Sequence, residues 1–196
     1  VYMTQKIINY INDNPYSDVE ISPYDEFILR LVALLHDLAH MPFGHTMESE
    51  SNLFEGQWED SYRLKKYLDQ DSDASKILHD CNELKELDAE CGRHEYNPQS
   101  IINELKKIMI ALETHDVSDL DKPYLCDIVG DTLCADLLDY IKRDFYFLGL
   151  REDYDDRFLS YLYVTEYNEK NRLVLRMNKP SSKLLRRDVQ SEFMHL

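Results

Sequence analysis

Residues 36–45 read HDLAHMPFGH, so that His36, Asp37, His40 and His45 fall within ten positions. His36 and Asp37 come at the end of an apolar segment, which is an unusual place for two polar groups unless something binds them. Imidazole and carboxylate together form a ligand set that suits Mn²⁺, Fe²⁺, Zn²⁺, Ni²⁺ or Mg²⁺. The stretch is therefore a candidate metal site; the alternative is three surface histidines near the end of a helix.

The segment before these histidines predicts a core helix. Ser22-Pro23 is a typical helix start, with proline at the first helical position. Apolar side chains then recur every three or four positions, as on the buried face of a helix. They are Phe27, Leu31, Leu34, Leu35 and Leu38. Pro42 is expected to end this helix around His40, because the residue before a proline is pushed out of the α region.

The positions of the histidines on these helices suggest different roles. His40 lies one turn after His36 and so shares its face. The break at Pro42 turns His45 into a new helix, in which Glu48 follows three positions later. A carboxylate at that spacing holds an imidazole in one tautomer and raises its basicity, as proton transfer requires.

A second group of polar residues lies on the helix predicted over 131–148. Asp136, Tyr140 and Asp144 follow one another at intervals of four, so one face carries carboxylate, phenol and carboxylate. Asp136 is the best-placed ligand to complete a metal site that His36 and Asp37 begin on the helix over 22–40. The alternative is a solvated acidic face with an Asp139–Arg143 ion pair.

The composition excludes several classes of protein. The 196 residues include 22 Lys and Arg against 38 Asp and Glu, which gives a net charge of −16. That charge argues against binding nucleic acid through a broad basic face and against adhesion to an anionic membrane. No run of 18 apolar residues predicts a membrane span. The four cysteines form no C-x-x-C pair, so we expect reduced thiols and a cytoplasmic protein.

The order of elements predicts one mainly helical domain over residues 1–196, cut from a longer chain. Only five Gly and six Pro favour helices over turn-dense sheet. Helices are expected over 3–13, 22–40, 97–114, 119–129 and 131–148. Two further helices are expected to begin at 43 and at about 58, and short surface helices are expected within 69–97. A β-hairpin is predicted within 159–178, with strands over 159–165 and 172–177 around a turn at Asn168-Glu169-Lys170-Asn171. Residues 180–196 begin a following helical region.

Two motifs in this order resemble one known family. The segment 36–45 matches the pattern H-D-x-x-H-x-P-F-x-H of the HD-domain phosphohydrolases, and 136–149 resembles the pattern D-x-x-D-Y-x-x-R-D…L-G of their deoxynucleoside triphosphate triphosphohydrolase branch. The similarity extends over about residues 20–190. A second dipeptide, His115-Asp116, lies in an acidic loop without such a context, and we interpret it as structural.

The resemblance implies a fold and an activity. The fold is an HD-domain helical bundle with a small hairpin, and the reaction is hydrolysis of a dNTP to a deoxynucleoside and inorganic triphosphate by attack of water at the α-phosphate. The partner is a nucleotide, with neither nucleic acid nor a membrane expected, and homo-oligomers are common in the family. The metal ligands that the resemblance implies are His36, Asp37 and Asp136. The reaction site is implied to be lined by His40, His45 and Glu48. The sugar or the phosphates would be contacted by Tyr140 and Asp144.

Three departures from the family pattern keep other functions open. No histidine occurs before His36, so we expect the family's first metal ligand to precede Val1. Trp58 stands where the family has a further histidine, and Leu137 stands where it has a lysine that contacts substrate. The alternatives are therefore an HD nucleotidase or phosphodiesterase with another phosphorylated substrate, and a degenerate HD module that binds nucleotide without turnover.

Overall fold

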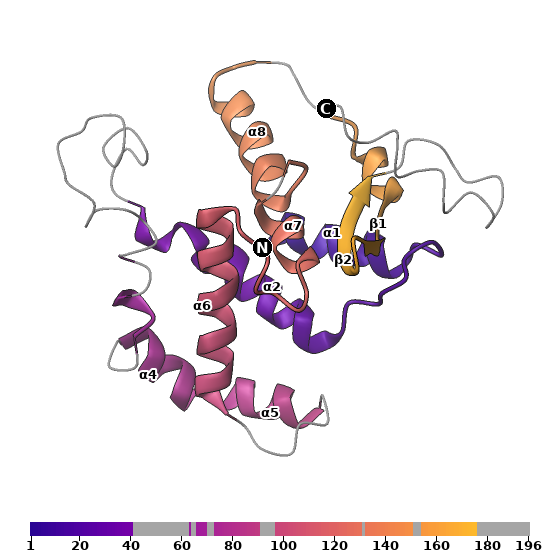
Figure 1. Cartoon of the computed structure of the whole chain (residues 1–196). Helices are drawn as coiled ribbons and strands as arrows, with labels where there is room; N and C mark the ends of the chain where they lie inside the picture. Colours follow the sequence, from indigo (N-terminus) through magenta and orange to yellow (C-terminus); the bar gives the residue numbers. More distant parts are fainter. Residues whose placement is uncertain are drawn as a thin grey trace.

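The computed structural model describes residues 1–40, 63, 66–69, 73–90, 97–130, 132–150 and 154–175. In this part the chain is mainly helical and carries one antiparallel hairpin, as predicted (Figure 1). The α-helices are α1 (Tyr2–Asn12), α2 (Pro23–Leu35), α4 (Asp73–Asp80), α5 (Asn82–Glu90), α6 (Pro98–Thr114), α7 (Tyr124–Gly130) and α8 (Ala135–Phe147). The remaining elements are the 3-10 helices η1 (His36–Ala39) and η3 (Asp156–Tyr161) and the strands β1 (Leu162–Tyr167) and β2 (Lys170–Leu175). The helices predicted from 43 and over 180–196 lie outside the described residues, as does most of the one predicted from about 58.

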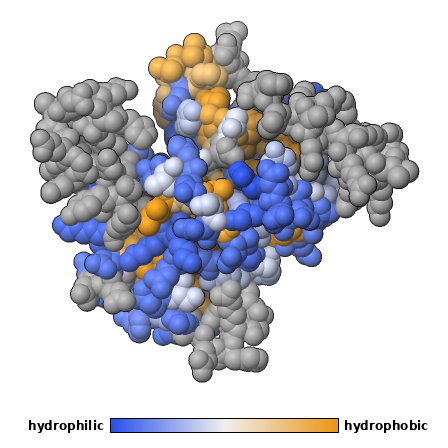
Figure 2. All heavy atoms as spheres, in the orientation of Figure 1, coloured by the Kyte–Doolittle hydropathy of each residue, from blue (hydrophilic) through white to orange (hydrophobic). Residues whose placement is uncertain are grey.

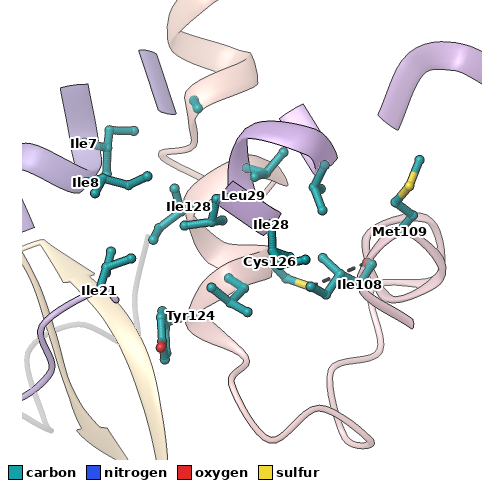
Figure 3. Packing of buried hydrophobic residues seen from close by; sticks show 14 of the residues in the cluster. Ile7, Ile8, Ile21, Ile28, Leu29, Ile108, Met109, Tyr124, Cys126 and Ile128 are labelled. Carbon is teal, nitrogen blue, oxygen red and sulfur yellow. Dashed lines mark hydrogen bonds between the residues drawn. The ribbon is translucent and has the colours of Figure 1, made fainter. Parts of the chain in front are cut away.

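The hydrophobic core lies where α1, α2, α6 and α7 meet (Figure 3). Each of these helices contributes large apolar side chains that are almost completely buried. The burial of such side chains is the dominant favourable term in folding. The largest of them are Ile7, Ile8, Ile11, Ile28, Leu29, Leu105, Ile108, Met109, Leu125 and Ile128. The core thus holds α2, whose last residue precedes His36, against helices from both halves of the chain.

The predicted buried face of α2 is wrong in part. Ile28, Leu29 and Val32 are fully buried, whereas Leu34 is 65% exposed and Leu38 is 49% exposed. Leu34 follows Glu26 and Arg30 at intervals of four, so it lies on the polar side of the helix, which the prediction from apolar spacing did not take into account.

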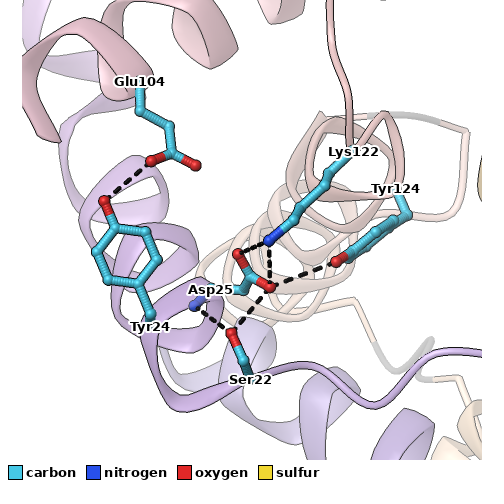
Figure 4. Close-up of polar contacts among 6 residues, drawn as sticks. All are labelled: Ser22, Tyr24, Asp25, Glu104, Lys122 and Tyr124. Carbon is cyan, nitrogen blue, oxygen red and sulfur yellow. Dashed lines mark hydrogen bonds and ion pairs between the residues drawn. The ribbon is translucent and has the colours of Figure 1, made fainter. Parts of the chain in front are cut away.

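The start of α2 is fixed by a buried carboxylate (Figure 4). Ser22 caps the helix by accepting the Asp25 N–H at 3.1 Å, and its hydroxyl donates to the Asp25 carboxylate at 2.9 Å. Lys122 donates to both oxygens of Asp25 at 2.6 and 2.8 Å. Tyr124 donates to the same carboxylate at 3.4 Å, and burial beside Asp25 raises the pKa of its phenol far above the usual value. This network joins the beginning of α2 to the beginning of α7.

The hairpin is closed by a two-residue turn. Asn168 and Glu169 have φ values of 50° and 66°, the left-handed pair that a type I′ turn needs. The strands pair from Leu162 opposite Leu175 to Tyr167 opposite Lys170. The turn is therefore two residues shorter than the four-residue loop that the sequence suggested, and η3 takes the place of the first predicted strand residues.

Side chains and backbone from elsewhere cover both edges of the hairpin. On the β1 side, Val164 donates its N–H to the Ser17 hydroxyl at 3.2 Å and accepts the Asp18 N–H at 2.7 Å. On the β2 side, the buried Asp127 carboxylate of α7 accepts the Leu173 N–H at 3.0 Å and binds Arg172 through two contacts of 2.7 Å. The hairpin is thereby fastened to α7.

The surface of the described part is polar over most of the visible face, with an apolar tip at the end of α8 (Figure 2). The short helices α4 and α5 occupy the acidic stretch where short surface helices were predicted. Among the described residues no helix is long and apolar enough to cross a bilayer.

Candidate metal centre

The first part of the candidate site is a tight turn at the end of α2. The α-helix ends at Leu35 and continues as η1, which the His40 N–H closes by donating to the Asp37 carbonyl at 3.1 Å. The helical conformation thus stops before His40, close to the predicted end, but its last turn is of the 3-10 type. Because residues three apart eclipse in a 3-10 helix, His40 Nε2 lies 3.3 Å from Asp37 Oδ1.

The second part is the first turn of α8. The sulfur of Cys134 caps this helix by accepting the Leu137 N–H at 3.4 Å. Burial raises the pKa of the Cys134 thiol, which favours its neutral form. This cap places Asp136 in the first turn, where the helix dipole favours a carboxylate. Nothing in the sequence pattern singled out Cys134, since a cysteine is not a usual capping residue.

The structure brings three of the predicted residues together. His36 Nε2 lies 3.3 Å from Asp37 Oδ1 and 3.5 Å from Asp136 Oδ1. One ligand atom from each of the three side chains falls within 4.8 Å of the others. His36 and Asp136 are a hundred positions apart in the sequence, so this proximity is a property of the fold.

The donor atoms of this group suit a divalent cation. His36 is mostly buried, yet neither of its ring nitrogens makes a hydrogen bond of normal geometry within the described part of the chain. A buried polar atom without a partner costs free energy, and a metal ion would relieve that cost. One imidazole nitrogen and two carboxylate oxygens are the ligand types that Mn²⁺, Fe²⁺ and Zn²⁺ accept.

The charged side chains of this group shift the pKa values of one another. Burial lowers the pKa of His36, but the carboxylates of Asp136 and Asp37 raise it by more, so the pKa of the imidazole lies above its usual value. The nearby imidazole of His36 lowers the pKa of Asp136. The two aspartates therefore create a local excess of negative charge, which a cation would offset.

The remaining predicted site residues differ in their placement. Tyr140 is 38% exposed and lies one turn after Asp136 on α8. Asp144 is exposed a further turn along, where Arg143 approaches it at 3.9 Å. The Asp139–Arg143 ion pair that the sequence suggested is present on the same helix. His45 and Glu48 lie outside the described residues, and so does Trp58.

Several contacts fix α8 against the rest of the fold. Asp156 of η3 binds Lys142 of α8 at 2.9 Å and also binds Lys6 of α1. Tyr154 donates its hydroxyl to the Leu138 carbonyl at 2.7 Å, and the Lys142 ammonium lies over its ring at 4.3 Å. At the other end Gly149, with φ of 69°, ends the helix in a Schellman motif. These contacts hold the helix that carries Asp136.

Asp156 gives a prediction for the dependence of stability on pH. Lys6 and Lys142 lower the pKa of Asp156, so its contribution to stability is present above the unfolded value of 3.8 and is lost as the pH falls through the lower folded value. We expect Asp156→Asn to lower the melting temperature by a constant amount near neutral pH and by progressively less below pH 3.8. Thermal melts at a series of pH values measure this, with Asp119→Asn at an exposed position as control; a deficit that persists unchanged in acid would contradict it.

The second His-Asp dipeptide has a structural role, as expected. His115 has φ of 53° and ends α6 in the left-handed conformation. Asp116 accepts the Ser118 N–H at 2.9 Å, which is a turn-forming contact. The dipeptide is thus part of the loop after α6 and forms no metal group with the described residues.

Comparisons with known proteins identify a family and a relative that this chain resembles. The family model described as HD domain matches residues 1–122, which include His36, Asp37 and His40 but end before Asp136. A relative from Dictyostelium discoideum, the deoxynucleoside triphosphate triphosphohydrolase SAMHD1 homolog, is 25% identical over 138 residues. That similarity covers 67% of this chain and 23% of the relative, so the chain spans less than a quarter of the relative's length.

Proposed function

Given that the chain belongs to the HD domain family, we propose that it is a metal-dependent phosphohydrolase that acts on nucleotides, with a deoxynucleoside triphosphate as its substrate. The observation that carries the proposal is the meeting of His36, Asp37 and Asp136 around one point. The substrate class rests on the name of the relative and on the α8 motif from Asp136 to Asp144.

His36, Asp37 and Asp136 would hold the divalent cation, which when bound offsets charge on phosphate oxygens and polarises water. The side chain of Asp37 is 60% exposed and that of Asp136 39%, so substrate can reach both carboxylates from solvent. His36, at 21%, closes the inner side of the group.

The other predicted residues would bind substrate and move protons. His40 faces the Asp37 carboxylate, which can orient its ring and hold a proton on the facing nitrogen. Tyr140 and Asp144 lie along the exposed face of α8 and would contact the deoxyribose or the phosphates. His45 and Glu48 would supply a further proton-transfer pair. In the proposed reaction water adds to the α-phosphorus, the bond to the sugar oxygen breaks, and that oxygen takes up a proton.

The experiment that tests the proposal identifies the phosphate product. The full-length native protein is incubated with each of the four dNTPs, singly and mixed, in Mn²⁺ and in Mg²⁺, and the products are separated by ion-exchange chromatography. We expect inorganic triphosphate and a free deoxynucleoside in equal amounts. Orthophosphate or a nucleoside monophosphate would contradict the triphosphohydrolase reaction and favour another HD phosphohydrolase.

Leu137 favours a second candidate, a nucleotide-binding module without turnover. This half-buried side chain directly follows Asp136, at the position where the related pattern has a lysine. A triphosphate pocket that lacks this positive charge attracts its substrate less strongly, in a chain of net charge −16. Nucleotide binding measured by calorimetry without release of any product would favour the module over the enzyme.

A further inference from the structure

One side chain from outside the candidate metal centre binds the backbone of the turn that carries it. Arg63 donates its Nε–H to the Ala39 carbonyl at 2.7 Å. Ala39 is the last residue of η1 and lies between Asp37 and His40. The contact therefore joins a residue 24 positions downstream to the segment that supplies part of the metal group.

The Ala39 carbonyl needs such a partner. Carbonyls at the C-terminal end of a helix have no amide partner within that helix. Ala39 is 3% exposed, so its backbone has little access to water. A buried carbonyl without a hydrogen bond is destabilising, and a charged donor makes a stronger bond than a neutral one. Arginine is also a favourable donor at a helix C-terminus, because its charge complements the helix dipole.

The turn also has little internal support. Four residues form η1, and 3-10 hydrogen bonds have poorer geometry than those of an α-helix. The side chains of Asp37 and His40 depend on this turn for their direction, since their 3.3 Å contact follows from the spacing of three. A bond to Ala39 from outside therefore limits how far the turn can open.

We propose that Arg63 is a positioning residue that holds η1 closed, so that Asp37 and His40 stay in place beside His36 for metal binding. The proposal rests on the proposed metal-dependent function. It assigns to Arg63 no contact with metal or substrate. Its action passes through the Ala39 carbonyl, in the way that residues around the ligands of a metal site commonly set ligand geometry.

The test is a titration of the full-length native protein with Mn²⁺, followed by calorimetry or by the electron paramagnetic resonance of free Mn²⁺. We expect Arg63→Ala to weaken Mn²⁺ binding about 10–100-fold, the usual effect of removing an outer partner of a metal site. Arg63→Lys keeps a charged donor and should recover part of the affinity. Arg63→Met keeps the hydrocarbon packing without a donor, so it replaces the alanine variant if that variant does not fold.

Two further measurements separate positioning from general stability. Amide hydrogen exchange in EDTA should be faster at residues 37–40 of Arg63→Ala and unchanged in α6. Arg30→Ala removes a half-exposed arginine from α2 and serves as the matched control, with unchanged Mn²⁺ affinity expected.

Unchanged Mn²⁺ affinity in Arg63→Ala, equal weakening in Arg30→Ala, or faster exchange throughout the core would overturn the role of Arg63. A wild-type protein that binds no Mn²⁺ would instead refute the proposed function. The exchange experiment contains no metal, so it still decides in that case whether Arg63 holds the turn.

Discussion

Asp37→Ala is expected to reduce dNTP hydrolysis about a thousandfold or more. The substitution removes one of the three side chains whose ligand atoms lie within 4.8 Å of one another. A bound metal ion supplies several kcal/mol of transition-state stabilisation, which a variant without this ligand would lose. Asp136→Ala should have an effect of the same size, although Asp136 lies ninety-nine positions after Asp37, on α8. The measurement is kcat/KM from the release of inorganic triphosphate at saturating Mn²⁺.

The chain contains its own matched control for this prediction. Asp116→Ala changes the same residue type in the second His-Asp dipeptide, which lies in the loop after α6. We expect this variant to keep wild-type activity at a temperature at which it is folded. Activity of Asp37→Ala within threefold of wild type would remove Asp37 from the metal group, and a large loss in Asp116→Ala would mean that both dipeptides matter for other reasons.

Arg172→Ala is expected to lower the free energy of unfolding by about 3–5 kcal/mol, because it leaves the Asp127 carboxylate buried without its cation. Asp127 has a side chain that is 4% exposed and two contacts of 2.7 Å with the guanidinium. For a chain of this size the change corresponds to a melting temperature lower by about 10 °C. Urea unfolding followed by circular dichroism measures it.

Two companion variants show whether the cost comes from breaking the pair between these two charges. Arg172→Lys keeps a charge but loses the two-pronged contact, so it should fall between wild type and Arg172→Ala. The double variant Asp127→Leu with Arg172→Leu removes both charges, and we expect it to recover much of the loss. A cost below about 1 kcal/mol for Arg172→Ala would place the pair among the weak surface pairs and contradict the prediction.

Local signals in the sequence predicted much of the fold. Asn97-Pro98 marks the start of α6, and Asn97 indeed caps it by accepting the Ser100 N–H at 3.2 Å. Gly149 directly follows the helix predicted over 131–148 and indeed ends α8, because only a residue that tolerates positive φ fits there. The hairpin followed from β-branched and aromatic runs around polar turn residues. These features depend on neighbours in the sequence, which is why the sequence reveals them.

Features that depend on distant partners were not predictable in the same way. Asp25 and Asp127 are acidic residues on helices, and no local signal pairs them with Lys122 and Arg172. The cap on α8 by Cys134 departs from residue preferences.

The candidate site also has one part that local sequence signals predict and one part that depends on the fold. The segment from His36 to His40 stands out in the sequence, because polar groups there interrupt an apolar run. Asp136 alone resembles any acidic residue on a solvated helix, and only the motif around it suggested a role. Its position 3.5 Å from His36 adds a geometric reason that spacing along the chain could not give.

The covered edges of the hairpin bear on how copies of this protein meet at high concentration. A bare strand edge offers unpaired amides and carbonyls to which another chain can add a strand, and such additions begin many aggregates. Here Ser17 and Asp18 bind Val164 on one side, and Asp127 binds Leu173 on the other. The same carboxylate that fastens the hairpin to α7 thus also blocks strand addition at Leu173, so loss of Asp127 would cost colloidal solubility as well as folding stability.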